Sequence, residues 1–515
     1  MKNSFADTAL LSIILLAIFV VPSSISGTAL ALPAIGADIQ APLTSLQWVV
    51  NAFNLAFACF TLAWGALADR LGRKRCFVAG ASLYVVASVL SAVAESAWLL
   101  DVARGLAGIG AAAIFSCGIA ILSTHFDGPA RLRAFALFGT VAGLGVSLGP
   151  TLSGLLLDSV GWRAIFWAHA VTLVIVLLGS PLITRDGQLA ERTARFDVPG
   201  ATLFVLALLA LMVAIVQGSQ WGWTSPGVLG LVAVSAVLLA VFTWQERRHL
   251  QPMLDLSLLS SGPFVGLALV TVAASFGFVT LLTYLPSYLF GVLQLSATHA
   301  GLAMLLLTVP MLFCPILAGK WAARGVSAIG ILKASLIALL VGVVALALVS
   351  QVGVTLWQLA LPLLLVGVGM GLSAGLVDGL ALKTVPEQKA GMAAGLLNTF
   401  RLGSEAIAVA LYGSLLATLL DSQLRGTLSR LAPDPTTLQR WIDEVAAGNL
   451  TGSLQALGTE QAGTVHSLFI GGYDSAFHGV LWALAVILLV LTVVVTWLVR
   501  PLRQQERVEA QLAAH

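Results

Sequence analysis

One long apolar segment carries three polar residues, one of which has a carboxyl group that could exchange a proton. Asn398, Arg401 and Glu405 are spaced three and four residues apart, so they share one face of a helix. Glu405 lies about 15 residues into the segment, close to mid-membrane at about 1.5 Å per residue. Burial there favours the protonated carboxyl, whereas the Arg401 charge favours the carboxylate. The pattern predicts a proton-carrying Glu405, with a static Arg401–Glu405 ion pair as the alternative.

Two further ionisable residues, Arg104 and Asp378, also lie within apolar segments. A guanidinium at the depth of Arg104 should face a partner or a wet cavity, or else extend to the outer interface. Asp378 follows a ladder of small residues that indicates close helix packing, and a role in coupling is the alternative. The ladder consists of Gly367, Gly371, Gly375 and Gly379.

A short charged stretch separates two uncharged segments near the N-terminus. It runs from Gly65 to Arg75 and contains Asp69, Arg70, Gly72, Arg73 and Lys74. Translocation of a Lys and Arg cluster is unfavourable, so this loop is predicted on the cytoplasmic side. We expect Asp69 and the cations at 73–75 to latch helix ends there in one state of the protein, with simple charge anchoring as the alternative.

The elements that position these residues must be membrane helices. The 515 residues are 59% hydrophobic and only 10% charged, which excludes a soluble globular protein. Segments of roughly 20 apolar residues span a bilayer. By that measure we predict fourteen spans, at about 9–32, 46–66, 77–95, 98–122, 134–157, 163–183, 198–217, 227–245, 262–291, 298–319, 327–350, 355–381, 390–420 and 477–499.

Basic residues gather in alternate loops, which an odd number of spans would not produce. Both termini are therefore predicted to be cytoplasmic, with the first apolar segment retained as a helix. The net charge of +3 is small and spread over short loops, so nucleic acid is not an expected partner. Cys59, Cys76, Cys117 and Cys314 lack metal-ligand spacing, so we expect no metal site and no disulfide framework.

The charged loop resembles the loop signature of the major facilitator superfamily, where glycine, aspartate and arginines recur at these intervals. The Arg104 segment resembles the fourth-helix signature of that superfamily, with Ala107 in place of the usual glutamine. The resemblance implies a fourteen-helix drug/proton antiporter and a proton-coupling role for Arg104. Members of that family typically carry an aspartate before the Ala-Leu-Pro that ends helix one, and Ser24 stands there instead. Coupling is therefore expected to shift toward Glu405.

The fifth segment carries a glycine and proline run, with Gly145, Gly149, Pro150 and Gly154. These residues predict a bendable, closely packed helix. The run also resembles the motif that separates exporters from importers in the superfamily, with Ser153 at a position that is usually glycine. It is the feature that favours outward transport.

We expect two six-helix bundles with a two-helix insert, assigned to residues 1–185, 186–255 and 256–515. A long extracytoplasmic loop is expected at about 421–476. Paired halves with a site between them are a common transporter plan. Aromatic and amide side chains suit amphipathic organic substrates, although ordinary packing is the alternative. The candidate contacts are Asn51, Asn54, Phe57, Phe276, Tyr284, Tyr288 and Asn398.

The predicted function is proton-coupled export of amphipathic small organic molecules such as drugs, by alternating access. A proton symporter that imports a nutrient and a dedicated metabolite exporter are the alternatives. We expect no enzymatic activity and no cofactor, because no phosphate-binding loop, metal cluster or catalytic triad is present in the sequence. The expected setting is a bacterial cytoplasmic membrane, with a monomer whose partners are its substrate, protons and the bilayer.

Overall fold

The computed structural model describes residues 4–39, 43–183, 197–248, 257–295, 297–386, 389–429, 431–432, 434–446, 450, 459–504 and 506. All regular elements in these ranges are helices. Among them, 14 stretches are long and apolar enough to cross a membrane, which confirms the predicted number. In hydrocarbon a helix satisfies its own backbone hydrogen bonds, which is why near-continuous apolar segments adopt this form.

The first half and the insert contain long, mostly unbroken helices. The first half comprises α1 (Ser4–Ile39), α2 (Leu43–Leu71), α3 (Arg73–Ala92), α4 (Ala97–His125), α5 (Gly128–Ser159), α6 (Arg163–Gly179) and the short turn η1 (Ser180–Leu182). The insert comprises α7 (Val198–Trp221) and α8 (Pro226–Arg248). The segments that join the insert to the two halves, 184–196 and 249–256, lie outside the described residues.

The second half is more interrupted. It comprises α9 (Ser257–Ser260), α10 (Gly262–Ala274), the π-helical turn η2 (Ser275–Val279), α11 (Thr280–Gly291), α12 (Ala297–Thr308), α13 (Pro310–Ala323), α14 (Ala328–Val349), α15 (Leu356–Ser373), α16 (Leu376–Lys383), α17 (Ala390–Leu428), α18 (Pro435–Ala446) and α19 (Thr459–Leu498). Three spans are therefore assembled from two or more shorter helices.

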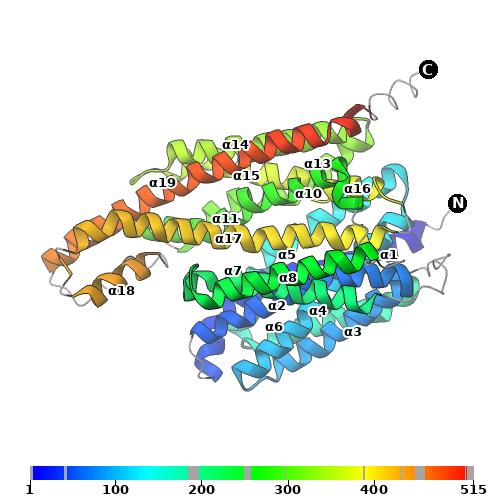
Figure 1. The fold of residues 1–515 in the computed structure, drawn as a ribbon, viewed down its shortest axis with the longest axis horizontal. Coiled ribbons are helices and arrows are strands. Elements are labelled where there is room, and N and C mark those ends of the chain that lie inside the picture. Colours follow the sequence, from blue (N-terminus) through cyan, green and yellow to red (C-terminus); the bar gives the residue numbers. More distant parts are fainter. Residues whose placement is uncertain are drawn as a thin grey trace.

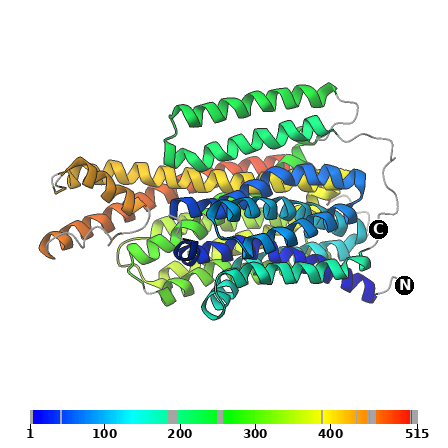
Figure 2. The ribbon, with the colours of Figure 1, turned by 90° about the horizontal axis from the view of Figure 1, so that it is seen from below.

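The start of α1 and the end of α19 lie at one end of the bundle, called here the terminal end, and α18 lies at the opposite end (Figure 1). The two halves meet where α2 packs on α17 and where α5 packs on α13 and α16. Of the insert, α7 contacts α2 and α17, whereas α8 packs on α7 (Figure 2). The insert thus covers one seam between the halves.

Three helices differ in detail from the predicted spans. The span expected at 390–420 continues to Leu428, and the one expected at 477–499 begins at Thr459, so both helices extend into the range assigned to the loop at 421–476. The span expected at 355–381 breaks between α15 and α16, where Gly375 has a φ of 75°. A Cβ at Gly375 would lie 2.0 Å from the Phe135 carbonyl oxygen, so both the dihedral angle and the contact require glycine.

Candidate functional site

A cavity of about 760 Å³ lies between the two halves. Its walls come from α1, α2, α4 and α5 of the first half and from α10, η2, α11, α13, α15, α16 and α17 of the second half. Helix α7 of the insert also contributes Met212, Ile215 and Val216. The insert therefore forms part of the cavity wall, which the hydrophobic pattern of α7 did not reveal.

Most of the cavity surface is apolar. Aliphatic side chains are the most numerous in this surface, aromatic rings and methionines lie among them, and Phe57 lies edge-on to Phe115 with ring centroids 5.2 Å apart. The aromatic and methionine lining residues that sequence reasoning did not single out are Phe115, Phe138, Met212, Phe278, Met311 and Met370. Such a wall can adapt to ligands of different shapes, because methionine has flexible torsions and a polarisable sulfur.

One wall of the cavity carries a charged network from α16 and α17. The Arg401 Nη2 donates to both carboxylate oxygens of Asp378, at 2.8 and 2.9 Å. The Arg401 Nη1 donates to the Asn398 Oδ1 at 3.2 Å. The Asp378 side chain is only 2% exposed, against 20% for Arg401, so the acid is the more deeply buried partner. The break at Gly375 starts the short helix that brings Asp378 to α17.

Glu405 lines the same cavity, one turn along α17 from Arg401. Among the described residues it forms no hydrogen bond and no ion pair within 4 Å, and Arg401 pairs with Asp378 instead. The static Arg401–Glu405 pair considered from the sequence is therefore not formed in this structure. Glu405 is therefore a carboxyl group that faces the cavity next to an arginine whose hydrogen bonds go to Asp378 and Asn398.

Five of the seven expected substrate contacts line the cavity: Asn51, Asn54, Phe57, Tyr284 and Asn398. The Tyr284 hydroxyl donates to the Val409 carbonyl oxygen at 3.0 Å, which fixes the ring on the wall. Asn398 also reaches across the seam, because its Nδ2 lies 3.5 Å from the Thr61 Oγ1 of α2. These side chains come from both halves, as a site between the halves requires.

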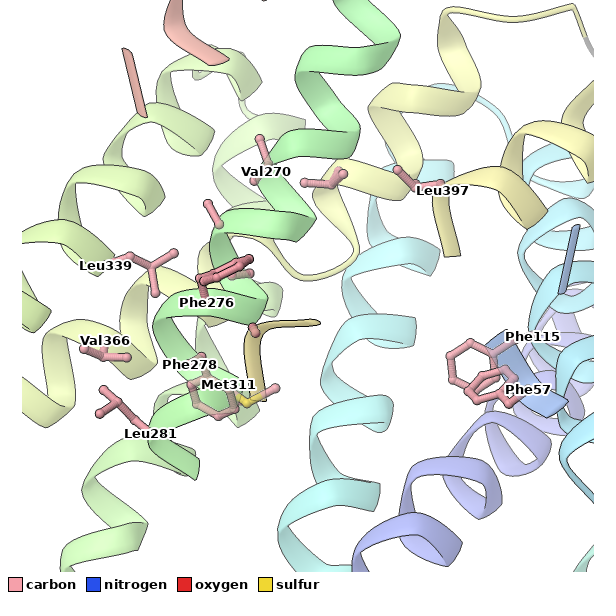
Figure 3. Close-up of a cluster of buried hydrophobic side chains, with 14 of the residues drawn as sticks. Phe57, Phe115, Val270, Phe276, Phe278, Leu281, Met311, Leu339, Val366 and Leu397 are labelled. Carbon is pink, nitrogen blue, oxygen red and sulfur yellow. The ribbon is translucent and has the colours of Figure 1, made fainter. Parts of the chain in front are cut away.

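The other two expected contacts, Phe276 and Tyr288, do not line the cavity. Tyr288 is fully buried, stacks on Phe477 with ring centroids 4.3 Å apart and donates to Asp474 at 2.7 Å. Phe278 lies beside Met311 (Figure 3) and lines the cavity, whereas Phe276 does not. Both phenylalanines lie in the π-helical turn η2, across which the regular 3.6-residue spacing does not hold. The aromatic residue type that selected Phe276 and Tyr288 did not indicate which side chains of this span face the cavity.

Arg104 lies outside the cavity lining and is 1% exposed. Its Nη1 donates to the Ser24 Oγ at 2.8 Å, and its Nε donates to the Val49 carbonyl oxygen at 3.0 Å. The guanidinium carbon lies 4.3 Å from the centre of the Phe53 ring. Arg104 is therefore buried among neutral groups and does not extend to the interface.

The charged stretch of residues 65–75 joins the two halves at the terminal end. Asp69 accepts hydrogen bonds from the backbone N–H groups of Gly391, at 3.0 Å, and Met392, at 2.9 Å, where α17 begins. Arg73 lies 3.3 Å from the Asp69 carboxylate, and Lys74 donates to the Ile183 carbonyl oxygen at 2.6 Å. A Cβ at Gly65 would lie 2.2 Å from the Gly391 carbonyl oxygen, so the two helices touch backbone to backbone.

The glycine run of α5 packs against α1. A Cβ at Gly145 would lie 2.7 Å from the Phe19 carbonyl oxygen, and one at Gly149 would lie 2.3 Å from the Ser26 Oγ. Pro150 and Gly154 continue the same helix. The close approach of two backbones explains why small residues recur here.

Comparison with known proteins identifies the family. The sequence profile of the Major Facilitator Superfamily matches residues 14–409. The chain belongs to this superfamily. Multidrug resistance protein Stp of Mycobacterium tuberculosis is 33% identical over 407 residues, which cover 79% of this chain and 75% of that protein. A probable actinorhodin transporter of Streptomyces coelicolor is also 33% identical, over 76% of this chain and 69% of its own length.

Further relatives and solved structures agree with this assignment. The tetracenomycin C resistance and export protein of Streptomyces glaucescens is 29% identical, over 87% of this chain and 84% of its own length. The human organic anion transporter MFSD10 matches with a TM-score of 0.62 at 16% identity, covering 95% of this chain and 99% of that one. At that identity the likeness shows the fold alone. This chain is thus a multi-pass transporter of the major facilitator superfamily.

In the described part of the structure, the two halves are in direct contact at the terminal end. The Asp69 contacts with α17 and the Gly65–Gly391 contact close the seam between α2 and α17. On the other side, a Cβ at Gly319 of α13 would lie 2.5 Å from the Ala136 Cβ of α5. The two seams are therefore closed by corresponding elements of the two halves, with the cavity beyond them.

Proposed function

We propose that this transporter exports amphipathic small organic molecules, drugs and antibiotics among them, in exchange for protons. The observation that carries the proposal is one cavity of about 760 Å³ that holds both a broad apolar wall and the Asp378, Arg401 and Glu405 group. The relatives named for multidrug resistance and for antibiotic export support the same substrate class. We further propose a bacterial cytoplasmic membrane location, with the terminal end in the cytoplasm.

Glu405 is the proposed proton carrier. Asp378 has a guanidinium partner that stabilises its carboxylate, whereas Glu405 has no such hydrogen bond among the described residues. Arg401 lies one turn from Glu405 on α17, so a change in the Asp378 contact would alter the charge that Glu405 experiences. Proton binding and substrate binding would then favour opposite conformations, as exchange by alternating access requires.

Asp69 is proposed as part of the latch for the conformation with a sealed terminal end. Its two hydrogen bonds join the end of α2 to the first turn of α17. Opening toward the terminal end must break them, because they cross the seam between the halves. Helices α1 and α5 pack closely at Gly145 and Gly149. We propose that these two helices move relative to each other at this contact when the transporter changes conformation.

Replacement of Glu405 by Gln tests the proton-carrying role. We expect proton-driven export from proteoliposomes to fall to background, because glutamine cannot exchange a proton, while the Tm of the purified transporter stays within a few degrees of wild type. The measurements are substrate-induced proton release and substrate efflux under an imposed pH gradient.

Asp421→Asn is the matched control, because Asp421 lies on the same helix, pairs with Arg425 and does not line the cavity. Normal substrate-induced proton release in Glu405→Gln would refute the assignment of Glu405.

Susceptibility profiling of a transporter-deficient host, with and without a protonophore, tests the substrate class. Protection against one compound alone would favour the dedicated metabolite exporter.

A further inference from the structure

A second polar site lies inside the first half, outside the transport cavity. It is formed by Ser24 and Thr28 of α1, Tyr84 of α3, Arg104 of α4 and His169 of α6, and we call it the Arg104 cluster. All five side chains are buried, with exposed fractions of 0% for Ser24, Thr28 and Tyr84, 1% for Arg104 and 7% for His169. Buried polar groups normally find partners, so this cluster requires an explanation.

Four atoms of the cluster form no hydrogen bond of normal geometry in the described part of the chain. They are the Nη2 of Arg104, the hydroxyls of Tyr84 and Thr28, and the Nδ1 of His169. Tyr84 lies beside both Ser24 and Arg104, and His169 lies within electrostatic range of Arg104. Thr28 lies one helical turn from Ser24 and shares its face of α1. Tyr84 and His169 therefore lie near the guanidinium, and Thr28 lies on the face of α1 that presents Ser24 to it.

The cluster carries a positive charge without a negative one. Arg104 stays protonated in proteins, and burial of an uncompensated charge costs several kcal/mol. The guanidinium forms no ion pair within 4 Å of any described carboxylate, including that of Asp101, one turn away on the same helix. Its neighbours are the Ser24 and Tyr84 hydroxyls, the Val49 carbonyl oxygen and the Phe53 and Phe166 rings. None of these neutralises it.

The unpartnered atoms form a donor set. The Arg104 N–H groups donate only, the Tyr84 and Thr28 hydroxyls can each donate, and His169 donates in the tautomer protonated on Nδ1. Several donors around a buried cation are the arrangement that holds a small anion. We propose that the Arg104 cluster binds one monovalent inorganic anion of the size of chloride, as a structural counter-ion of the first half.

The surroundings favour a small, enclosed ligand. Val49 and Phe166, which flank Arg104, belong to a compact apolar group with Ala31, Ile35 and Trp162. Trp162 and Arg163 in turn hydrogen-bond to Asp38 at the end of α1. The cluster residues are absent from the cavity lining, and the closely packed apolar residues beside them favour a small anion over a bulky organic one.

The test measures the Tm of the purified full-length transporter as chloride replaces gluconate at constant ionic strength. A ligand that binds only the folded state raises the Tm with a saturating dependence on its concentration. We expect such a rise for wild type. In Tyr84→Phe, the loss of one hydrogen bond to a charged ligand should raise the half-maximal chloride concentration about tenfold.

Tyr473→Phe is the matched control, because the Tyr473 hydroxyl is also buried without a hydrogen-bond partner but lies on α19 of the other half. Its chloride response should equal that of wild type. In Ser24→Asp, the new carboxylate should pair with Arg104 and replace the anion, so the Tm in gluconate should equal or exceed that of wild type in chloride, with no further chloride effect.

Two results would overturn the proposal. One is a Tm of the wild-type protein that does not depend on chloride. The other is an equal chloride response in wild type, Tyr84→Phe and Ser24→Asp, which would place any chloride binding elsewhere. Because the measurement needs no transport, its outcome is independent of whether the exporter and proton-coupling proposals hold.

Discussion

Arg104 and Arg401 are both arginines inside membrane helices, one in each half, yet their surroundings differ. Arg401 lies on the wall of the cavity, 20% exposed, and its Nη2 contacts both oxygens of Asp378. Arg104 is 1% exposed and contacts a hydroxyl, a carbonyl oxygen and an aromatic ring. The comparison indicates that the carboxyl groups of the cavity lining belong to the second half. The first half instead holds a buried cation, Arg104, outside the cavity.

The largest expected effect follows from removal of the acidic partner of Arg401. Arg401 then lacks a carboxylate partner, as Arg104 does in the described part of the chain. Asp378→Asn should destabilise the transporter by about 3 kcal/mol and abolish transport, because it leaves a partly buried guanidinium without its counter-charge. Thermal unfolding of the purified protein and efflux from proteoliposomes measure the two effects.

The double variant Asp378→Asn with Arg401→Gln distinguishes charge from packing. It should recover most of the lost Tm, since no unpaired charge remains, while transport stays absent. If the single variant unfolds at the wild-type temperature, the Asp378–Arg401 pair contributes little and the contrast between the two arginines loses its basis.

A smaller effect on stability is expected from the close packing of α1 on α5, since no ion pair between described residues joins these two helices at the cavity. Gly149→Ala places a Cβ 2.3 Å from the Ser26 Oγ and 2.9 Å from the Ser23 carbonyl oxygen. The resulting separation of α1 and α5 should cost about 2 kcal/mol of stability and reduce the export rate. Gly105→Ala on α4 is the control, because its Cβ meets nothing within 4 Å. Equal Tm values for the two variants would contradict the packing role of Gly149.

The smallest of the three effects concerns Asp69, the carboxylate that the first half places at the terminal end. Asp69→Asn keeps the shape but weakens the hydrogen bonds to the Gly391 and Met392 N–H groups by about 1.5 kcal/mol. The sealed conformation should become about tenfold less populated relative to the open one, so turnover falls with little change in KM.

Cysteine cross-linking across the α2–α17 seam reports that population directly. Asp127→Asn, an exposed acid in a neighbouring loop, serves as the control, since its carboxylate bonds only Arg131 in the described structure. Unchanged cross-linking and turnover in Asp69→Asn would show that the latch does not limit the cycle.

The sequence determined the features that depend on local composition. Fourteen apolar segments and the fold class followed from length and hydropathy, because a bilayer requires long apolar helices. The family was recognisable because the charged loop and the glycine run are local motifs. The spacing also placed Asn398, Arg401 and Glu405 correctly on one helix face, and all three line the cavity.

Tertiary structure alone decided which groups meet. Arg401 pairs with Asp378, 23 positions away, because the chain breaks at Gly375. Helical spacing alone places only one acidic residue, Glu405, next to Arg401. In the π-helical turn η2 it is Phe278 and not Phe276 that lines the cavity, and helix α7 supplies Met212 from a segment whose sequence predicts only a membrane helix. The charge of Arg104 was evident from the sequence, but its lack of a carboxylate partner emerged only when four helices enclosed it, because burial and pairing are properties of the packed chain.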